Sequence, residues 1–388
     1  MTPPSLPRPL PAVVGNDQTG ELRRRVRAFL DEERAEGRFE PRVNSWMDGW
    51  DPPFSRRLAA RGFAGMTVPT RYGGAGRTFL ERFVITEELL AAGAPVAAHW
   101  FADRQVAPAL LASGTEEQRA ELLPGIAAGE LSFAIGMSEP DSGSDLASVR
   151  TRAVRRDDGN WVITGTKVWT SGAHRADRLL LLARTAPGDP AARHAGLSQF
   201  VIDLATPGVH VRPVLSMDGE HHFNEVVLDQ AVVPSTSLLG VEGEGWRQVT
   251  AELGFERSGP ERFMSAHQLL EEAARDARGH DRARRGSVPA DLGRSLARTA
   301  ALRALSMSVA AAITAGEDPR VHASYVKLLG TQHEQQLVEN ASLEGPALDA
   351  DGLRPHVVAG LLSRPTYTLR GGSNEVLRGI IAREIGAR

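Results

Sequence analysis

The sequence predicts an α+β multidomain protein in which a helical domain precedes a β domain and a second helical domain follows it. Two observations support this prediction. Apolar residues recur at helical spacing before about residue 132 and again after about residue 242, whereas short apolar runs separated by glycine, proline and aspartate occupy the stretch between them. Because the strands come together in one block, the order excludes a Rossmann-type fold, in which strands and helices alternate.

The N-terminal part of the chain combines a tail with a helical domain. Four prolines break the first ten residues, so residues 1–16 are expected to be a mobile tail that lacks the apolar block of a secretion signal. Residues 17–131 are expected to be helical, with Leu22, Val26 and Phe29 on one apolar face. The stretch Thr115–Gln118 fits a capping box and predicts a helix start at that point.

Residues 132–241 are predicted to form the β domain. Its strand-like runs are Trp161–Val168, Leu179–Leu182, Phe200–Leu204 and Glu225–Leu228. Gly165 lies inside the first run and indicates a bend or bulge, because glycine weakens a regular strand.

Residues 242–388 are predicted to form a helix bundle. Helical spacing covers Leu253–Ala274, Leu292–Ala315, Val321–Leu343 and Asn374–Ile385, with loops at Gly316–Pro319 and Gly345–Leu353. The arginine-rich stretch 275–294 fits either a loop or an exposed helix end.

Composition excludes several classes of function. The chain has 45 basic and 48 acidic residues, so it has no basic field for a nucleic acid or an anionic membrane. It has no cysteine, which excludes disulfides, iron-sulfur clusters, thiolate zinc sites and a cysteine nucleophile. No uninterrupted apolar run reaches the roughly 18 residues of a membrane-spanning helix, so a soluble, cytoplasmic protein is expected. His221 and His222 have no third ligand at useful spacing, and no metal site is expected.

Four short motifs hold most of the residues suited to chemistry. A strand-like run enters a polar turn at 133–145, FAIGMSEPDSGSD, and the segment 164–172, TGTKVWTSG, ends in a tryptophan beside two hydroxyl residues. Later, Gly243–Trp246 precedes a helix that contains Leu253–Arg257, LGFER. The stretch Arg370–Glu375, RGGSNE, precedes the last helix, with Gly371 at a position suited to a positive φ and Ser373 as its N-cap.

These motifs, in this order, resemble those of the acyl-CoA dehydrogenase family. The blocks SEPDSGSD at 138–145 and KVWTS at 167–171 carry the resemblance, which extends over nearly the whole chain. It implies an N-terminal helical domain, a middle β-barrel-like domain and a C-terminal four-helix bundle. It also implies an oxidoreductase acting on CH–CH groups, which converts an acyl thioester to the trans-2-enoyl form.

The resemblance further implies a noncovalently bound FAD. Met137 and Ser138 would face the pyrimidine side of the flavin, Trp169 would cover the ring, and the Ser171 hydroxyl would lie near N5. The expected FAD-binding residues are Ile135, Met137, Ser138, Trp169, Thr170, Ser171, Arg282, Ser373 and Glu375. The expected substrate-binding residues are Ser144, on the phosphopantetheine arm, with Trp100, Leu253 and Arg257; Trp100 lies near the position that floors the acyl pocket in one branch, although an ordinary core tryptophan also fits.

The position of the catalytic base distinguishes branches of the family. Most members have a glutamate immediately before the glycine that corresponds to Gly372, and here that position is Gly371. Other branches have the glutamate on the first helix of the C-terminal domain, and the matching residue here is Glu256. The resemblance therefore implies that Glu256 is the base, while the Gly371 amide helps to bind the thioester oxygen.

The implied partners are an acyl-CoA or acyl carrier protein thioester, electron-transferring flavoprotein as oxidant, and other subunits in a dimer or tetramer. In the family, an Arg-x-x-Phe-Gly segment from a neighbouring subunit touches the FAD diphosphate. Here the matching stretch, Arg282–Gly286, lacks the aromatic residue, and a glutamine and paired glycine are missing from 340–346. These departures leave two alternatives open: a non-catalytic partner subunit of a hetero-oligomer, and an oxidase-like flavoenzyme on the same fold.

Overall fold

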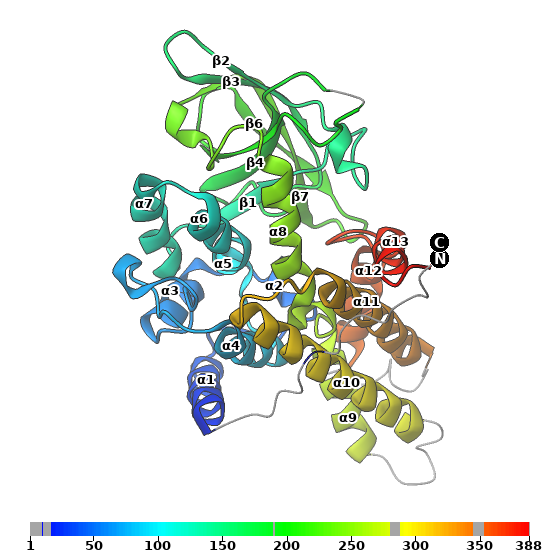
Figure 1. The fold of residues 1–388 in the computed structure, drawn as a ribbon. Coiled ribbons are helices and arrows are strands. Elements are labelled where there is room, and N and C mark those ends of the chain that lie inside the picture. The colour runs from blue at the N-terminus through cyan, green and yellow to red at the C-terminus, as the bar shows by residue number, and fades with distance from the viewer. Residues whose placement is uncertain (1–9, 11–16, 189–190, 280–287, 344–352, 388) are drawn as a thin grey trace. The chain divides into compact units, whose positions relative to one another are not determined.

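The computed structural model describes residues 10, 17–188, 191–279, 288–343 and 353–387. The chain divides into two compact units (Figure 1). Unit 1 comprises Met1–Trp50, Thr78–Val96 and Leu253–Arg388, and unit 2 comprises Asp51–Arg77 and Ala97–Glu252. Helix α8 (Gly245–Ser258) contributes its first half to unit 2 and its second half to unit 1.

Unit 2 is built on one curled β-sheet (Figure 1). Within the described residues its strands are β1 (Phe133–Gly136), β2 (Arg152–Arg155), β3 (Trp161–Lys167), β4 (Arg178–Arg184), β5 (Leu197–Asp203), β6 (Val209–Leu215) and β7 (His221–Val233). The strand order is β1-β4-β2-β3-β7-β6, and β5 pairs with β4. The register between β3 and β7 shifts between Ile163 and Gly165, which confirms the bulge expected at that glycine.

Two hydrophobic clusters cover the faces of this sheet. Inside the curl, Trp161 and Phe200 meet edge to face at 5.3 Å within a buried cluster of small and branched apolar residues. On the other side, Phe133 and Leu180 are buried against the helices of unit 2. These helices are α3 (Pro52–Ala60), α5 (Ala97–Phe101), α6 (Ala107–Ser113) and α7 (Glu116–Ala127), with short 3-10 turns at Thr70–Tyr72, Leu146–Ser148 and Ser235–Ser237 and a π-helical turn at Ala102–Val106.

A buried ion pair joins the turn after β1 to the end of β3. Lys167 Nζ lies 2.8 Å from Glu139 Oε1 and donates a second hydrogen bond of 3.0 Å to the carbonyl of Met137. Burial lowers the pKa of Lys167 to about 8, although the Glu139 carboxylate opposes that shift. Burial alone would raise the pKa of Glu139, but the Lys167 ammonium group and the backbone amide of Arg150 contribute to holding that pKa below its usual range.

Unit 1 is helical. Its elements are α1 (Asp17–Ala35), α2 (Ser45–Asp48), α4 (Phe79–Ala91), the second half of α8, the 3-10 turn η5 (Pro260–Arg262), α9 (His267–Gly279), α10 (Val288–Thr314), α11 (Arg320–Leu343), α12 (Leu353–Tyr367) and α13 (Asn374–Glu384). Helices α9 and α10 lie side by side (Figure 1), and α11 packs against both α12 and α13. Buried carboxylates of α4 tie neighbouring helices together, because Glu87 pairs with Arg23 of α1 and with Arg303 of α10.

Helix α10 has an apolar stretch at residues 290–314 that is long enough to cross a membrane by length and composition alone. Within unit 1 this helix packs on its neighbours. Met307 and Ala310 are buried against Phe83 of α4. Packing against neighbouring helices therefore accounts for the apolar composition of α10.

The helix expected over Leu253–Ala274 is wrong as a single element. Helix α8 ends at Ser258 and α9 begins at His267. Pro260 causes the break, because proline lacks the amide that a continuing helix needs, and Gly259 before it is extended at φ −82° and ψ 168°. The break creates the turn that carries Glu261, Arg262 and Ser265.

Two predicted helix caps are confirmed. The Thr115 side chain accepts from the Gln118 amide, and the Gln118 side chain accepts from the Thr115 amide, which completes a capping box at the start of α7. Ser373 caps α13 by accepting from the Val376 amide. Helix α12 was not anticipated from the spacing.

Both lysines of the chain are buried, with Lys167 and Lys327 each 0% exposed. We predict that an amine-acylating reagent near neutral pH leaves both side chains unmodified in the native protein and modifies both after unfolding in urea. The reason is exclusion of the reagent by the packed protein. Peptide mass spectrometry of native and urea-treated samples makes the measurement, and rapid modification of either lysine in the native sample would contradict the burial.

Candidate active site

Glu256 lies in the last turn of α8, and its side chain is 19% exposed. Arg262, at the end of η5, contacts it twice. Arg262 Nε donates to the Glu256 backbone carbonyl at 2.8 Å, and Nη2 donates to Oε1 at 3.1 Å. The first contact also satisfies one of the carbonyls that a helix leaves without partners in its final turn. The carboxylate is thus held by the protein and does not project freely into solvent.

Gly371 lies beside this carboxylate. Its φ is +69°, as its position before the α13 cap predicts. A Cβ placed on Gly371 would lie 3.1 Å from Glu256 Oε1 and 3.1 Å from Arg262 Nη2. Positions 256 and 371, the two at which the family resemblance could place a base, therefore lie next to each other. The side chain of Glu256 lies in the space that a side chain at 371 would enter.

Arg257 fixes the peptide on the other side of Gly371. It is 7% exposed, and its Nε donates to the Gly371 carbonyl at 2.9 Å. A Cβ on Gly372, at φ +91°, would lie 2.9 Å from Arg257 Nη2. Two consecutive glycines are therefore required here by positive φ and by the close approach of two arginines and a glutamate.

Lys327 of α11 binds both ends of the loop that contains these glycines. Its Nζ lies 3.2 Å from the Thr368 carbonyl and 3.2 Å from Asn374 Oδ1. Burial, reinforced by the guanidinium groups of Arg262 and Arg370, lowers the pKa of Lys327 to about 7. No sequence motif predicted this lysine at the site, yet it lies within the electrostatic influence of Glu256, Arg262 and Arg370.

Arg370 contacts two aromatic rings. Its guanidinium carbon lies 4.5 Å from the Trp46 ring centre and 4.8 Å from that of Tyr367. Its Nη2 donates to Ser265 Oγ at 2.7 Å and lies 3.6 Å from Glu334 Oε2. Glu334 is fully buried, and burial raises its pKa above the usual range. The sequence motifs did not predict that Arg262 and Arg370 belong to the site. The helix-breaking pair Gly259–Pro260 could have indicated Arg262, and the position next to Gly371 could have indicated Arg370.

The remaining site residues of unit 1 are less enclosed. Ser373 and Leu253 are partly buried, and Glu375 is exposed at the start of α13. The Glu375 amide and the Ser373 side chain lower the pKa of the Glu375 carboxyl. Arg282 lies outside the described residues.

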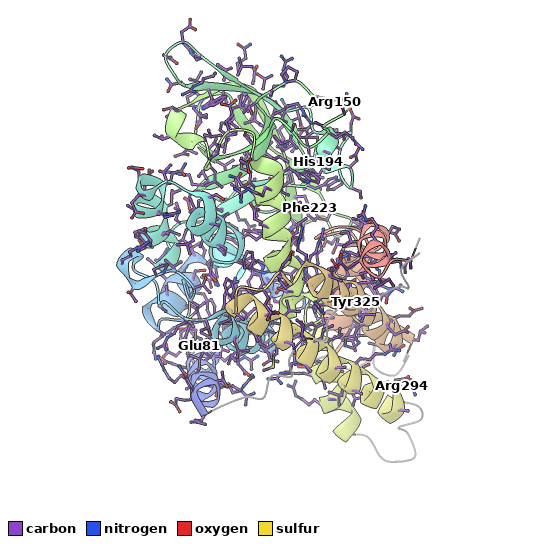
Figure 2. The ribbon with its side chains drawn as sticks, viewed as in Figure 1. Glu81, Arg150, His194, Phe223, Arg294 and Tyr325 are labelled. Atoms are coloured by element: carbon purple, nitrogen blue, oxygen red, sulfur yellow. The ribbon has the colours of Figure 1, made fainter. Side chains whose placement is uncertain are left out.

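In unit 2, Trp169 shows two unusual features. It is a non-glycine residue at φ +59°, and its side chain remains largely exposed, at 59%. The ring meets Phe223 of β7, labelled in Figure 2, edge to face at 5.7 Å. A bulky residue in the left-handed region is a strained conformation that the surrounding structure must impose. It is imposed here on the tryptophan expected to cover a flavin.

Hydrogen bonds to β7 hold the segment that follows Trp169. The amide of Thr170 donates to the Asn224 carbonyl at 3.0 Å, and Asn224 Nδ2 donates back to the Thr170 carbonyl at 2.9 Å. The Gly172 amide also donates to the His222 carbonyl, at 3.0 Å. Thr170 is buried and Ser171 is partly exposed.

Met137 and Ser138 lie next to this segment. The Val168 amide donates to the Ser138 carbonyl at 2.9 Å, and Lys167 binds the Met137 carbonyl. Both side chains, like that of Ile135, are partly exposed. The structure thus brings the two expected flavin-binding segments of unit 2 together, and the Lys167–Glu139 pair stabilises that arrangement.

The two remaining residues of the expected substrate site differ in exposure. Ser144 is exposed on the polar turn, next to Asp145, which pairs with Arg193 at 2.7 Å. Trp100 is 4% exposed, with the Arg104 guanidinium carbon 5.6 Å from its ring centre. Within the described ranges, no group of three acidic, histidine or cysteine residues is suited to a metal ion.

Comparison with known proteins identifies the family. Family models for the acyl-CoA dehydrogenase N-terminal, middle and C-terminal domains match residues 16–130, 134–231 and 243–386. FadE29 of Mycobacterium tuberculosis, named an acyl-CoA dehydrogenase, is 36% identical over 84% of this chain and 86% of its own length. The chain belongs to the acyl-CoA dehydrogenase family. FadE34 from the same organism, also named an acyl-CoA dehydrogenase, is 34% identical over 84% of this chain, which spans 45% of the FadE34 length.

Solved structures of acyl-CoA dehydrogenases agree with the fold. The steroid ACAD Tcur3481-Tcur3483 superposes with a TM-score of 0.84 at 30% identity, over 95% of this chain and 97% of the other. The ChsE4-ChsE5 complex of Mycobacterium tuberculosis gives 0.81 at 30% identity, over 97% and 99%. This acyl-CoA dehydrogenase is therefore an oxidoreductase that uses FAD.

The described residues fit the isoalloxazine end of FAD. Unit 2 offers an exposed tryptophan held at positive φ, a partly exposed hydroxyl at Ser171, and the methionine and serine at the end of β1. These groups would hold the ring by stacking and by hydrogen bonds to its polar edge.

We predict that Lys327→Met changes how stability depends on pH. The folded pKa of about 7 lies below the ordinary 10.5, so between these values the unfolded chain binds the extra proton and the unfolding free energy rises with pH. The variant loses this contribution, which reaches about 1.4 kcal/mol per pH unit. Urea unfolding of both proteins from pH 7 to 10 makes the measurement, and parallel pH profiles would contradict the assignment.

Proposed function

We propose that this acyl-CoA dehydrogenase removes the α-proton of an acyl-CoA through Glu256. The observation that supports this role is the position of Glu256 Oε1, 3.1 Å from where a Cβ of Gly371 would lie. A carboxylate from α8 thereby reaches the place beside the glycine loop that a base at 371 would otherwise serve. Glu261 and Glu334, also carboxylates of unit 1, are fully buried, whereas Glu256 retains partial access.

The proposed step breaks the Cα–H bond and transfers the proton to the Glu256 carboxylate. The Gly371 amide would bind the thioester oxygen, which draws charge from Cα and makes the proton more acidic. Arg257 supports this role by holding the Gly371 carbonyl, which fixes the orientation of the loop. When bound, FAD accepts the hydride from Cβ, so that the product is the trans-2-enoyl thioester.

We also propose a class of acyl group for the substrate. The solved relative Tcur3481-Tcur3483 is a steroid ACAD, so a polycyclic acyl-CoA is a candidate beside straight and branched chains. Electron-transferring flavoprotein is the proposed oxidant, and the cytoplasm is the proposed location.

We predict that Glu256→Gln strongly slows reduction of the bound flavin by acyl-CoA. Removal of a general base typically costs about 10²- to 10⁴-fold in rate. The flavin-loaded protein is titrated anaerobically with straight-chain, branched and steroid acyl-CoA thioesters while flavin bleaching is followed. Glu272→Gln, the same change at a carboxylate of α9 with 18% exposure, is the matched control.

The control is expected to bleach at the wild-type rate. Bleaching of Glu256→Gln within about threefold of the wild type would show that another group takes the proton, because that loss is far below the range for a general base.

We further propose that the chain assembles with a second, related acyl-CoA dehydrogenase chain. The departures at 282–286 and 340–346 affect positions that the family uses for the FAD diphosphate at a subunit interface. The ChsE4-ChsE5 complex, 30% identical to this chain, supports an assembly of this type.

We predict that the chain purified alone carries little FAD and gains it on co-expression with a paralogue that retains the aromatic diphosphate segment. The FAD-to-protein ratio from absorbance, together with mass by light scattering, makes the measurement. A homo-oligomer with one FAD for each chain would contradict hetero-assembly and leave the proposed chemistry in place.

A further inference from the structure

Arg262 reaches Glu256 only because the chain turns back after α8. Helix α8 ends at Ser258, Pro260 prevents the helix from continuing, and η5 places Arg262 six residues beyond the glutamate. In an uninterrupted helix, residues four apart share a face, whereas residues six apart do not. The break therefore gives the chain a contact that helical spacing alone does not provide.

The surroundings of Arg262 leave it little freedom. Its side chain is 1% exposed, and its guanidinium carbon lies 5.4 Å from the centre of the Trp46 ring. Its Nε lies 3.5 Å from Glu261 Oε1, which is itself buried. The planar guanidinium group thus contacts the Trp46 ring and two carboxylates, those of Glu256 and Glu261.

We infer that Arg262 is a positioning residue that holds the Glu256 carboxylate in the orientation from which it removes the α-proton. This inference rests on the proposed function of Glu256. Arg262 binds the backbone oxygen and the carboxylate of the same residue at 2.8 and 3.1 Å, so it fixes the side chain relative to its own main chain. A glutamate without such a contact samples several rotamers.

Gly371 bounds the carboxylate on its other side. Because the Cβ position of Gly371 is 3.1 Å from both Glu256 Oε1 and Arg262 Nη2, the carboxylate and the guanidinium meet directly above the glycine. The contact pair and the glycine together restrict the carboxylate to a small volume. A misplacement of about 1 Å is enough to cost on the order of 100-fold in rate.

Lysine does not replace arginine in this role. Both Nε and Nη2 of Arg262 are used, each toward a different oxygen of Glu256. An ammonium group keeps the positive charge but lacks the rigid fork that spans two acceptors. Arg262→Lys therefore tests the geometry of the contact separately from its charge.

The experiment measures proton removal without oxidation. The flavin-loaded holoenzyme is incubated in D₂O with a 3-thia-acyl-CoA, whose β-position is sulfur and does not donate hydride, and deuterium entry at Cα is followed by mass spectrometry. We expect Arg262→Gln to slow exchange at least about tenfold for each bound flavin, since the carboxylate loses its fixed position. The dissociation constant of the analogue, from the flavin spectrum, is expected to change less than about threefold.

Arg303→Gln is the matched control. Arg303 of α10 also pairs with a buried glutamate of unit 1, and that glutamate is Glu87 of α4. Its exchange rate is expected to stay within about twofold of the wild type, and its loss of stability is expected to be smaller than that of Arg262→Gln, because Arg303 is 40% exposed. Equal exchange in Arg262→Gln and the wild type would overturn the inference.

Two further variants keep the outcome unambiguous. Glu256→Gln reports on the proposed function: if it still exchanges at the wild-type rate, the base is another residue, whatever Arg262 does. Arg262→Lys retains a buried cation and is used if Arg262→Gln does not bind flavin. Slowed exchange in Arg262→Lys supports the inference, and exchange at the wild-type rate overturns it.

Discussion

A buried arginine must find acceptors within the protein, because an unpaired buried charge costs far more than folding can supply. Arg262 finds its acceptors on Glu256, and much of the C-terminal site depends on that contact. The contact depends on the turn at Gly259–Pro260, it sets the carboxylate beside Gly371, and it leaves little room for a side chain at that glycine. The proline makes the contact possible, and the glycine accommodates it.

The two lysines also find their acceptors within the protein, in a chain whose other 43 basic residues are arginines. Each is buried, and each donates to a backbone carbonyl in or next to a segment that the sequence motifs assign to the site. Lys167 holds Met137 at the end of β1, and Lys327 holds Thr368 at the start of the glycine loop. A compact ammonium suits these places, because it donates in several directions within a small volume. Arginine, with its larger planar group, binds carboxylates such as Glu256 and, at Arg257, the Gly371 carbonyl.

Sequence patterns predicted the order of helices, strands and helices, the Gly165 bulge and the caps at Thr115 and Ser373, because each is set by local chemistry. Motif resemblance predicted that Glu256 and Gly371 belong to one site, and the structure brings them together. The same reasoning missed Arg262, Lys327 and Arg370, whose importance comes from contacts between segments far apart in the chain. It also joined α8 and α9 into one helix, since apolar spacing outweighed the signal of Gly259 and Pro260. The roles of Ser144 and Trp100 stay predictions.

The central claim is that Glu256 lies against the reacting carbon. A crystal structure of the flavin-loaded enzyme with an unreactive acyl-CoA analogue tests it directly, through the distance from the Glu256 carboxylate to Cα. We expect a distance of about 3 to 3.5 Å, the separation of a near-attack arrangement, with Arg262 still bonded to the carboxylate. A Cα that lies beyond reach of Glu256 and next to a different basic side chain would contradict it.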